Sequence, residues 1–172
     1  MPSVRRFLAG TPFFGGLSDP ALDLLKARLV VHELAAGSYA FRAGDTGASM
    51  YIIEHGEVVL CQQGDSGMQV RLRRLGPGDF FGETTLIEMQ PRPYDAYVDS
   101  PARLLELDNR ALYELYKTDI LAYVMVLQNV NRELCRRLRR TDLRLTEFAD
   151  EARDDATQVR MLVARPAGEP KR

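Results

Sequence analysis

Short apolar runs separated by glycine-containing turns fill residues 29–108, and they constrain the fold more than any other feature of the sequence. The runs are Tyr51–Ile53, Val58–Leu60, Val70–Leu72 and Leu104–Leu107, and the turns are residues 36–38, 43–47, 54–56, 64–67 and 76–79. Many short strands at this spacing are typical of antiparallel architectures that close on themselves or form two sheets. Residues 64–67, flanked by apolar residues, indicate a hairpin turn. We therefore predict a mainly β fold, an antiparallel β-roll or jelly roll, with flanking helices.

Helical patterns lie on both sides of this region. Ser18 precedes Asp19-Pro20, as a helix N-cap with proline in the first turn does, and leucines recur at positions 22, 25 and 29. From residue 109 neither glycine nor proline occurs until Pro166, with a helix restart predicted near Thr118-Asp119. The predicted organisation is an N-terminal helical segment (1–28), a β-roll core (29–108), C-terminal helices (109–152) and a flexible tail (153–172).

The C-terminal helix carries a heptad pattern. Alternating steps of four and three residues connect Ile120, Val124, Leu127, Asn131, Leu134, Leu138, Thr141, Leu145 and Phe148. Such a seam predicts a coiled-coil homodimer, and an asparagine at an a position favours a parallel, in-register pair. The alternative is that the helix packs against its own roll. Six arginines at positions 132, 136, 137, 139, 140 and 144 form a solvated face, with binding of a phosphate backbone as the less favoured interpretation.

Composition restricts the function further. The formal net charge of −1 does not favour nucleic acid as a partner of the whole chain. The two cysteines, Cys61 and Cys135, are too few for a disulfide framework, so we expect free thiols in a reducing compartment. The first residues lack a signal-peptide pattern, and no apolar run approaches the about 20 residues of a membrane span. We expect a cytoplasmic protein without a membrane partner.

Catalytic and metal-binding patterns are weak. The two histidines, His32 and His55, do not belong to a cluster with metal-ligand spacing, which argues against a metal-dependent jelly-roll enzyme. They do not support a Ser-His-Asp or Cys-His set either, and His55 is assigned to the turn at residues 54–56. We expect no enzyme activity, no metal and no cofactor.

The segment from Phe80 to Arg92 has the composition of an anion site. Gly82 lets the backbone approach a ligand closely, and a helical turn from Glu83 would present the N–H groups of Thr84 and Thr85 to an anion. The carboxylate of Glu83 can accept hydrogen bonds from a sugar, and Arg92 offers a planar cationic fork to phosphate oxygens. Together these groups fit a small phosphate ester of a sugar.

The chain resembles the cyclic-nucleotide-binding domain family, which includes the bacterial catabolite activator and the regulatory subunit of cyclic-AMP-dependent protein kinase. The resemblance rests on segments in family-like order and spacing: residues 13–18, 41–45, 50–58, 75–83, 91–92 and 104–108. It implies that the glutamate of Phe-Gly-Glu, here Glu83, holds the ribose 2′-hydroxyl and that Arg92 holds the cyclic phosphate of cyclic AMP or cyclic GMP. It also implies help from the amides at Thr84 and Thr85. Thr141, after Arg136-Arg137-Leu138-Arg139-Arg140, is a candidate contact for the base.

The chain departs from the family pattern after the arginine, where Pro93-Tyr94-Asp95 replaces small and hydroxyl residues. Pro93 has no N–H to offer a phosphate, and Asp95 is expected to bring a negative charge near the pocket. Two hypotheses therefore stand. The first is a cyclic-nucleotide sensor that signals through its long helix or through a separate effector protein, and the second is a dimerisation or interaction scaffold that has lost the ligand.

The sequence leaves several identities open. Residues 149–172 are too few for a helix-turn-helix, so we expect no DNA-binding module in this chain. The residues do not choose between cyclic AMP and cyclic GMP, they do not exclude a cyclic dinucleotide, and they do not name the effector.

Overall fold

The structure is a computed structural model that describes residues 4–64 and 67–163, with side chains of the last helix described as far as Glu151. It consists of two compact units, Met1–Asn131 and Arg132–Arg172, which are described separately. The first unit contains all the strands and the site, and the second is helical.

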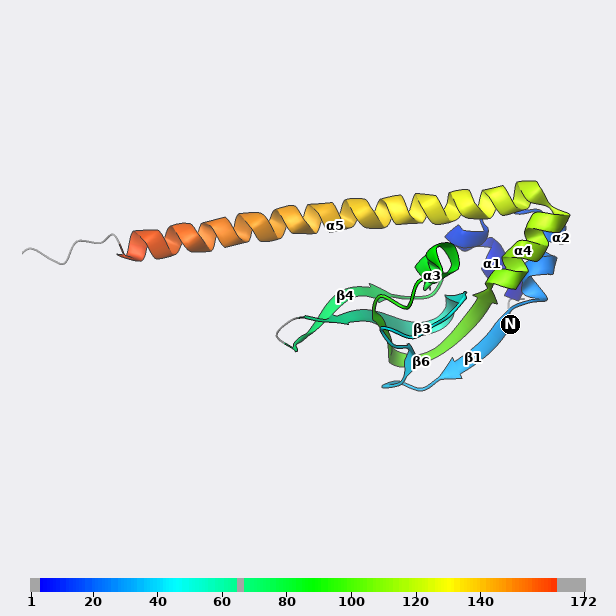
Figure 1. Cartoon of the computed structure of the whole chain (residues 1–172), viewed down its shortest axis with the longest axis horizontal. Coiled ribbons are helices and arrows are strands. Elements are labelled where there is room, and N and C mark those ends of the chain that lie inside the picture. Colours follow the sequence, from blue (N-terminus) through cyan, green and yellow to red (C-terminus); the bar gives the residue numbers. More distant parts are fainter. Residues whose placement is uncertain (1–3, 65–66, 164–172) are drawn as a thin grey trace, which may run out of the picture. The chain divides into compact units, whose positions relative to one another are not determined.

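Six antiparallel strands form the sheet of the first unit (Figure 1). They are β1 (Val30–Leu34), β2 (Tyr39–Phe41), β3 (Ser49–Gln63), β4 (Gln69–Leu75), β5 (Phe80–Phe81) and β6 (Asp95–Asp108). The main order is β1-β6-β3-β4, while β2 pairs with β6 and β5 pairs with β3. β3 and β4 form the hairpin predicted around residues 64–67. The prediction of an antiparallel fold with flanking helices and a long C-terminal helix is confirmed.

The predicted turn at residues 54–56 is wrong, because β3 runs through it without a break. Its pairing with β6 shifts register between Ile53 and Val58, so the strand bends there as a bulge does. Gly56 has φ +86°, and a Cβ at this position would lie 2.4 Å from the carbonyl oxygen of Pro101. The glycine therefore marks a close approach of two backbones within a continuous strand.

The apolar core lies on both faces of the long strands. Alternate residues of a strand point to opposite faces. Ile53 belongs to the cluster inside the roll, together with Phe41, Val58, Phe81 and Leu104. Its neighbour Ile52 on the other face is also fully buried. Both faces of β3 therefore carry buried apolar side chains.

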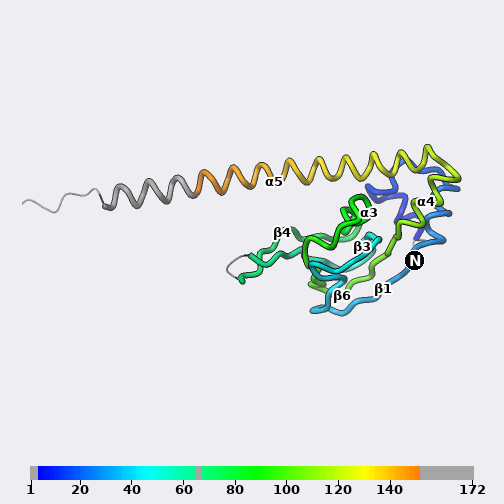
Figure 2. Tube along the Cα trace, viewed as in Figure 1, coloured from blue at the N-terminus to red at the C-terminus, as the bar shows by residue number. Residues whose placement is uncertain are grey.

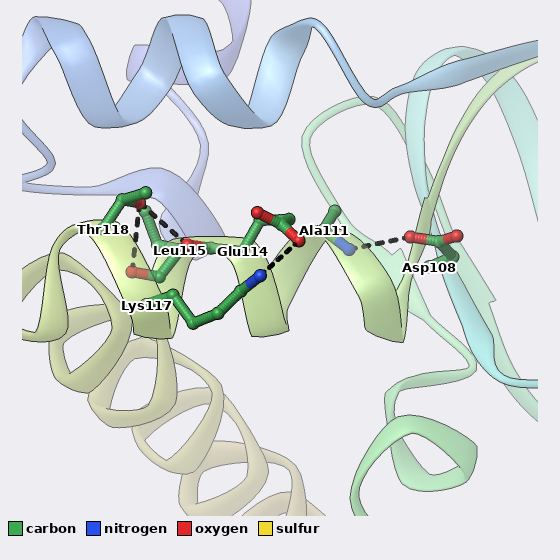
Figure 3. Close-up of polar contacts among 6 residues, drawn as sticks. All are labelled: Asp108, Ala111, Glu114, Leu115, Lys117 and Thr118. Atoms are coloured by element: carbon green, nitrogen blue, oxygen red, sulfur yellow. Dashed lines mark hydrogen bonds and ion pairs between the residues drawn. The ribbon is translucent and has the colours of Figure 1, made fainter.

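Short helices pack at one end of the sheet: α1 (Val4–Ala9), the 3-10 turn η1 (Pro12–Phe14), α2 (Asp19–Lys26) and α4 (Asn109–Thr118). Ser18 caps α2 as predicted, accepting a hydrogen bond from the N–H of Ala21 at 3.4 Å. Asp108 caps α4 by accepting from Ala111 N–H at 2.9 Å (Figure 3). The restart near Thr118-Asp119 is confirmed, because Asp119 accepts from Ala122 N–H at 2.9 Å where the last helix begins.

The last helix, α5 (Ile120–Val163), crosses from the first unit into the second (Figure 2). In the first unit it buries Ala122, Val126, Asn129 and Val130. The seam residues Val124, Asn131, Leu138, Thr141, Leu145 and Phe148 are exposed, and Leu127 and Leu134 are half-buried. The face that α5 buries near its start is therefore not the heptad seam.

The helix also extends further than the sequence suggested. Residues 153–163, which were predicted to belong to a flexible tail, continue α5. The absence of glycine and proline before Pro166 explains why the helical backbone persists when the apolar pattern stops. Residues 164–172 of the predicted tail lie outside the described residues.

Candidate functional site

Arg92 is the centre of the polar site in the first unit. It lies in the connection between α3 (Glu83–Glu88) and β6, and only 4% of its surface is exposed. Nη1 donates to the carbonyl oxygen of Gly82 at 3.0 Å and to Oγ1 of Thr85 at 3.2 Å. Nη2 donates to Oγ of Ser49, at the start of β3, at 3.3 Å. All these acceptors are neutral, and no carboxylate forms an ion pair with Arg92 among the residues that the structure describes.

Aromatic rings support the guanidinium. Its Cζ atom lies 4.2 Å from the ring centroid of Phe41 and 5.8 Å from that of Tyr51, which are distances at which cations and aromatic rings attract. Burial lowers the pKa of Arg92, because desolvation disfavours the charged form, and the nearby groups only partly oppose this effect. An arginine stays protonated at neutral pH, so the site holds a desolvated positive charge.

The guanidinium faces a cavity of about 470 Å³. The loop between β2 and β3 forms one wall with Asp45, Thr46 and Gly47, and the end of β6 contributes Glu106 and Asp108. The remaining lining comes from Ala40, Phe41, Ala48, Ser49, Tyr51, Arg92 and Arg110. The cavity thus offers a cation to an anionic group and carboxylates to hydrogen-bond donors of the same ligand.

Glu106 is held at the edge of this cavity by two partners. Its carboxylate lies 2.6 Å from Nε2 of His32 and accepts a hydrogen bond of 3.5 Å from the hydroxyl of Tyr51. Burial and the negative charge of Glu106 raise the pKa of Tyr51, so the phenol remains a neutral donor.

The short helix α3 carries the other residues predicted for the site. Gly82 precedes it with φ +79°, a conformation that favours glycine. Glu83 and Thr85 are almost fully buried, and Thr85 contacts Arg92. Thr84 is half-buried, and its Oγ1 has no hydrogen-bond partner in the described part of the chain. The structure brings Gly82, Thr85 and Arg92 into direct contact. Of these predicted residues only Arg92 lines the cavity described above, and Gly82, Glu83, Thr84 and Thr85 do not.

Pro93-Tyr94-Asp95 does not occupy the cavity. Pro93 is exposed, and Oδ1 of Asp95 accepts a hydrogen bond from the N–H of Ala43 at 2.8 Å. The Tyr94 hydroxyl accepts from Gly82 N–H at 3.4 Å, and its ring lies 5.9 Å from that of Phe41. The carboxylate of Asp95 is therefore hydrogen-bonded to the backbone of the β2–β3 loop, and Asp95 does not line the cavity beside Arg92.

Thr141 belongs to the second unit. It is exposed, and its hydroxyl donates to the carbonyl oxygen of Arg137 one turn earlier, at 3.1 Å. The same stretch holds the pair between Arg137 Nε and Glu133, also at 3.1 Å. A contact between Thr141 and a base stays a prediction.

Sequence reasoning missed several residues of the site, among them Phe41, Gly47 and Ser49. Phe41 begins a segment that carries the family resemblance, and Gly47 was assigned only to a turn. Ser49 lies 43 residues from Arg92 along the chain, so no local pattern connects the two. The described residues contain no group of three or more histidine, cysteine, aspartate or glutamate side chains arranged to hold a metal ion. No described helix is long and apolar enough to cross a membrane.

Comparisons with known proteins agree with this fold. The profile of the cyclic nucleotide-binding domain matches residues 31–119. The cyclic AMP receptor protein of Thermus thermophilus is 30% identical over 152 residues, covering 86% of this chain and 67% of the relative. The CRP-like cAMP-activated global transcriptional regulator of Mycobacterium tuberculosis is 29% identical over 164 residues, covering 94% of this chain and 71% of the relative. The chain therefore belongs to the cyclic nucleotide-binding domain family.

A solved structure supports the same assignment. The crystal structure of the Thermus thermophilus catabolite activator protein superposes with a TM-score of 0.70 at 29% sequence identity. The match covers 81% of this chain and 63% of that chain, so the present chain spans less than two thirds of the crystallised relative.

Proposed function

We propose that this chain is a regulatory module that binds cyclic AMP or cyclic GMP, with Arg92 holding the cyclic phosphate. The observation that carries the proposal is the buried Arg92 guanidinium, whose hydrogen-bond acceptors among the described residues are all neutral and which faces a cavity of about 470 Å³. A desolvated charge without an ionic partner is costly, and a bound phosphate would supply that partner.

The other ligand contacts follow from the family. Glu83 is the proposed acceptor for the ribose 2′-hydroxyl, and Gly82 gives the ligand access to the backbone. The amides of Thr84 and Thr85 are proposed donors to the phosphate, while Pro93 replaces a residue that would have offered one more N–H. Thr141 is the proposed contact for the base. The relatives named for cyclic AMP support this class of ligand.

The output is proposed to pass through α5. Its seam residues are exposed or half-buried in the single chain, which leaves them available to a second copy. A parallel homodimer would bury this seam, and the ligand would act on a separate effector by favouring one arrangement of the helices.

The ligand-free scaffold is not favoured. Its support from the sequence is Pro93, which has no N–H to offer a phosphate, and the negative charge of Asp95. That carboxylate instead accepts the N–H of Ala43 at 2.8 Å. The cation that a phosphate would require is buried and supported by Ser49, Thr85 and Phe41.

Isothermal titration with cyclic AMP and cyclic GMP tests the proposal. The expected result is saturable binding in the micromolar range. Arg92→Ala should weaken it roughly 10- to 100-fold, since a charge-assisted hydrogen bond contributes about 1.5–3 kcal/mol. Arg71→Ala, which removes an exposed arginine of β4, serves as the control and should bind as the wild type does. Absence of binding by folded wild-type protein up to millimolar nucleotide would overturn the proposal.

A further inference from the structure

Gly47 lies directly against the guanidinium group of Arg92. A Cβ atom at position 47 would be 2.8 Å from Nη2 of Arg92, 3.1 Å from Nε and 3.2 Å from Cζ. All three distances are below the 3.4 Å at which ordinary van der Waals contact begins. Gly47 does not have a left-handed backbone, so alanine would be compatible with its φ angle. Space for the guanidinium, and not backbone conformation, is what the missing side chain supplies.

Hydrogen bonds join the backbone of the loop that carries Gly47 to the backbone of Arg92, so the two segments cannot easily separate. The N–H of Gly44 donates to the carbonyl oxygen of Arg92, and the N–H of Arg92 donates to that of Asp45, both at 2.8 Å. The bond between Ala43 N–H and Asp95 attaches the same loop to the first residue of β6. Any clash at position 47 must therefore be relieved mainly by the Arg92 side chain.

The guanidinium has little room to retreat in the opposite direction. A Cβ at Gly82 would lie 2.6 Å from Nη1, so this second glycine also borders the guanidinium. Nη1 donates hydrogen bonds to Gly82 and Thr85, and Nη2 donates one to Ser49. The ring centroid of Phe41 lies 4.2 Å from Cζ. A guanidinium displaced from Gly47 would lose some of these contacts, and its Nε and Nη2 atoms would take a new direction.

We propose that Gly47 is a positioning residue for Arg92: the missing side chain at position 47 fixes where the guanidinium lies and thereby sets the affinity for the cyclic phosphate. The statement about affinity rests on the function proposed above. The statement about position stands on the geometry of the chain itself and is measurable without nucleotide.

Gly47→Ala tests the proposal, with Gly76→Ala as the matched control. Gly76 also lacks a left-handed backbone, and a Cβ there would meet no atom within 4 Å. We expect Gly47→Ala to weaken cyclic-nucleotide binding about tenfold or more, because it disturbs a charge-assisted contact. Gly76→Ala should keep the wild-type Kd. Equal affinities for the wild type and Gly47→Ala would overturn the proposal.

The Arg92 Nε–H resonance in a ¹H–¹⁵N correlation spectrum gives the independent readout. This resonance is assigned to Arg92 because it is absent from the spectrum of the Arg92→Lys variant. The resonance should shift in Gly47→Ala and stay in place in Gly76→Ala, whether or not nucleotide is present. An unshifted resonance in Gly47→Ala would overturn the proposal. If the wild type binds no nucleotide but the resonance shifts, the positioning role holds and the proposed function fails.

A second variant covers the case in which Gly47→Ala does not fold. Lysine at position 92 has no counterpart of Nη2, the atom that the new methyl group would approach most closely, and its ammonium group is not held in a planar fork and can turn away from position 47. The double variant Gly47→Ala/Arg92→Lys should therefore fold and melt near the temperature of Arg92→Lys alone. An unfolded double variant would show that position 47 needs glycine for another reason, which would overturn the proposal.

Discussion

The carboxylate of Asp95 accepts a hydrogen bond from the backbone N–H of Ala43 at 2.8 Å, although the two residues lie 52 positions apart. This bond connects the first residue of β6 to the loop that carries Gly44, Asp45 and Gly47. Asp95, which departs from the family pattern, therefore has a structural role next to the site.

Asp95→Ala should destabilise the fold by about 1 kcal/mol, the usual net value of one hydrogen bond. Chemical denaturation measures this change. Asp95→Asn is the control, because it keeps an oxygen acceptor for Ala43 N–H while removing the charge. If Asp95→Asn instead tightens nucleotide binding tenfold, the charge acts on the ligand and this account of Asp95 is wrong.

Asn129→Ala should cost about 2 kcal/mol of unfolding free energy. Nδ2 of Asn129 donates to the carbonyl oxygens of Phe13 at 3.1 Å and Gly15 at 2.8 Å, and truncation would leave both without that donor in a buried place. Urea unfolding of the variant is compared with Gln128→Ala, whose side chain is exposed on the same helix. Equal stabilities of the two variants would contradict the prediction.

Leu138→Asp should convert the proposed dimer to a monomer in sedimentation equilibrium, because a charge buried in a seam lacks an ionic partner. Leu143→Asp is the matched control. Leu138 is 62% exposed and on the seam, while Leu143 is 66% exposed and off it. Loss of the dimer in both variants, or in neither, would argue against the heptad seam.

Thiol reactivity should separate the two cysteines. Cys135 is exposed, whereas Cys61 is buried and desolvation raises its pKa. A raised pKa leaves less thiolate at a given pH, so Cys61 should react with a disulfide reagent only when the protein unfolds. Native protein should show one rapidly modified thiol, and Cys135→Ser should show none. Rapid reaction of the Cys135→Ser protein would mean that the roll opens readily around Cys61.

Local patterns were sufficient to predict three features of this fold. The cap at Ser18, the restart at Asp119 and the hairpin around residues 64–67 each depend on residues close in sequence, and the structure contains all three. The bend in β3 was mistaken for a turn because the glycine signal is the same in both. Only the approach of Pro101 from β6 distinguishes them, and that contact is tertiary.

The candidate site also combines residues that local sequence could predict with tertiary contacts that it could not. Gly82 and Arg92, which were both predicted for the site, lie ten residues apart in the sequence and are in contact in the structure. The hydroxyl of Ser49 and the space left by Gly47 depend on how the β2–β3 loop meets the connection before β6. These contacts could not be predicted from one sequence, because no short-range periodicity reports on them.

The two backbone hydrogen bonds that join Arg92 to Gly44 and Asp45 make the position of the cation a shared property of two chain segments that are far apart in the sequence. A substitution that distorts the loop between β2 and β3 should therefore move the charge even when Arg92 and the helix before it are unchanged. The arginine alone does not specify the site, because the loop that it is bonded to specifies where its charge lies.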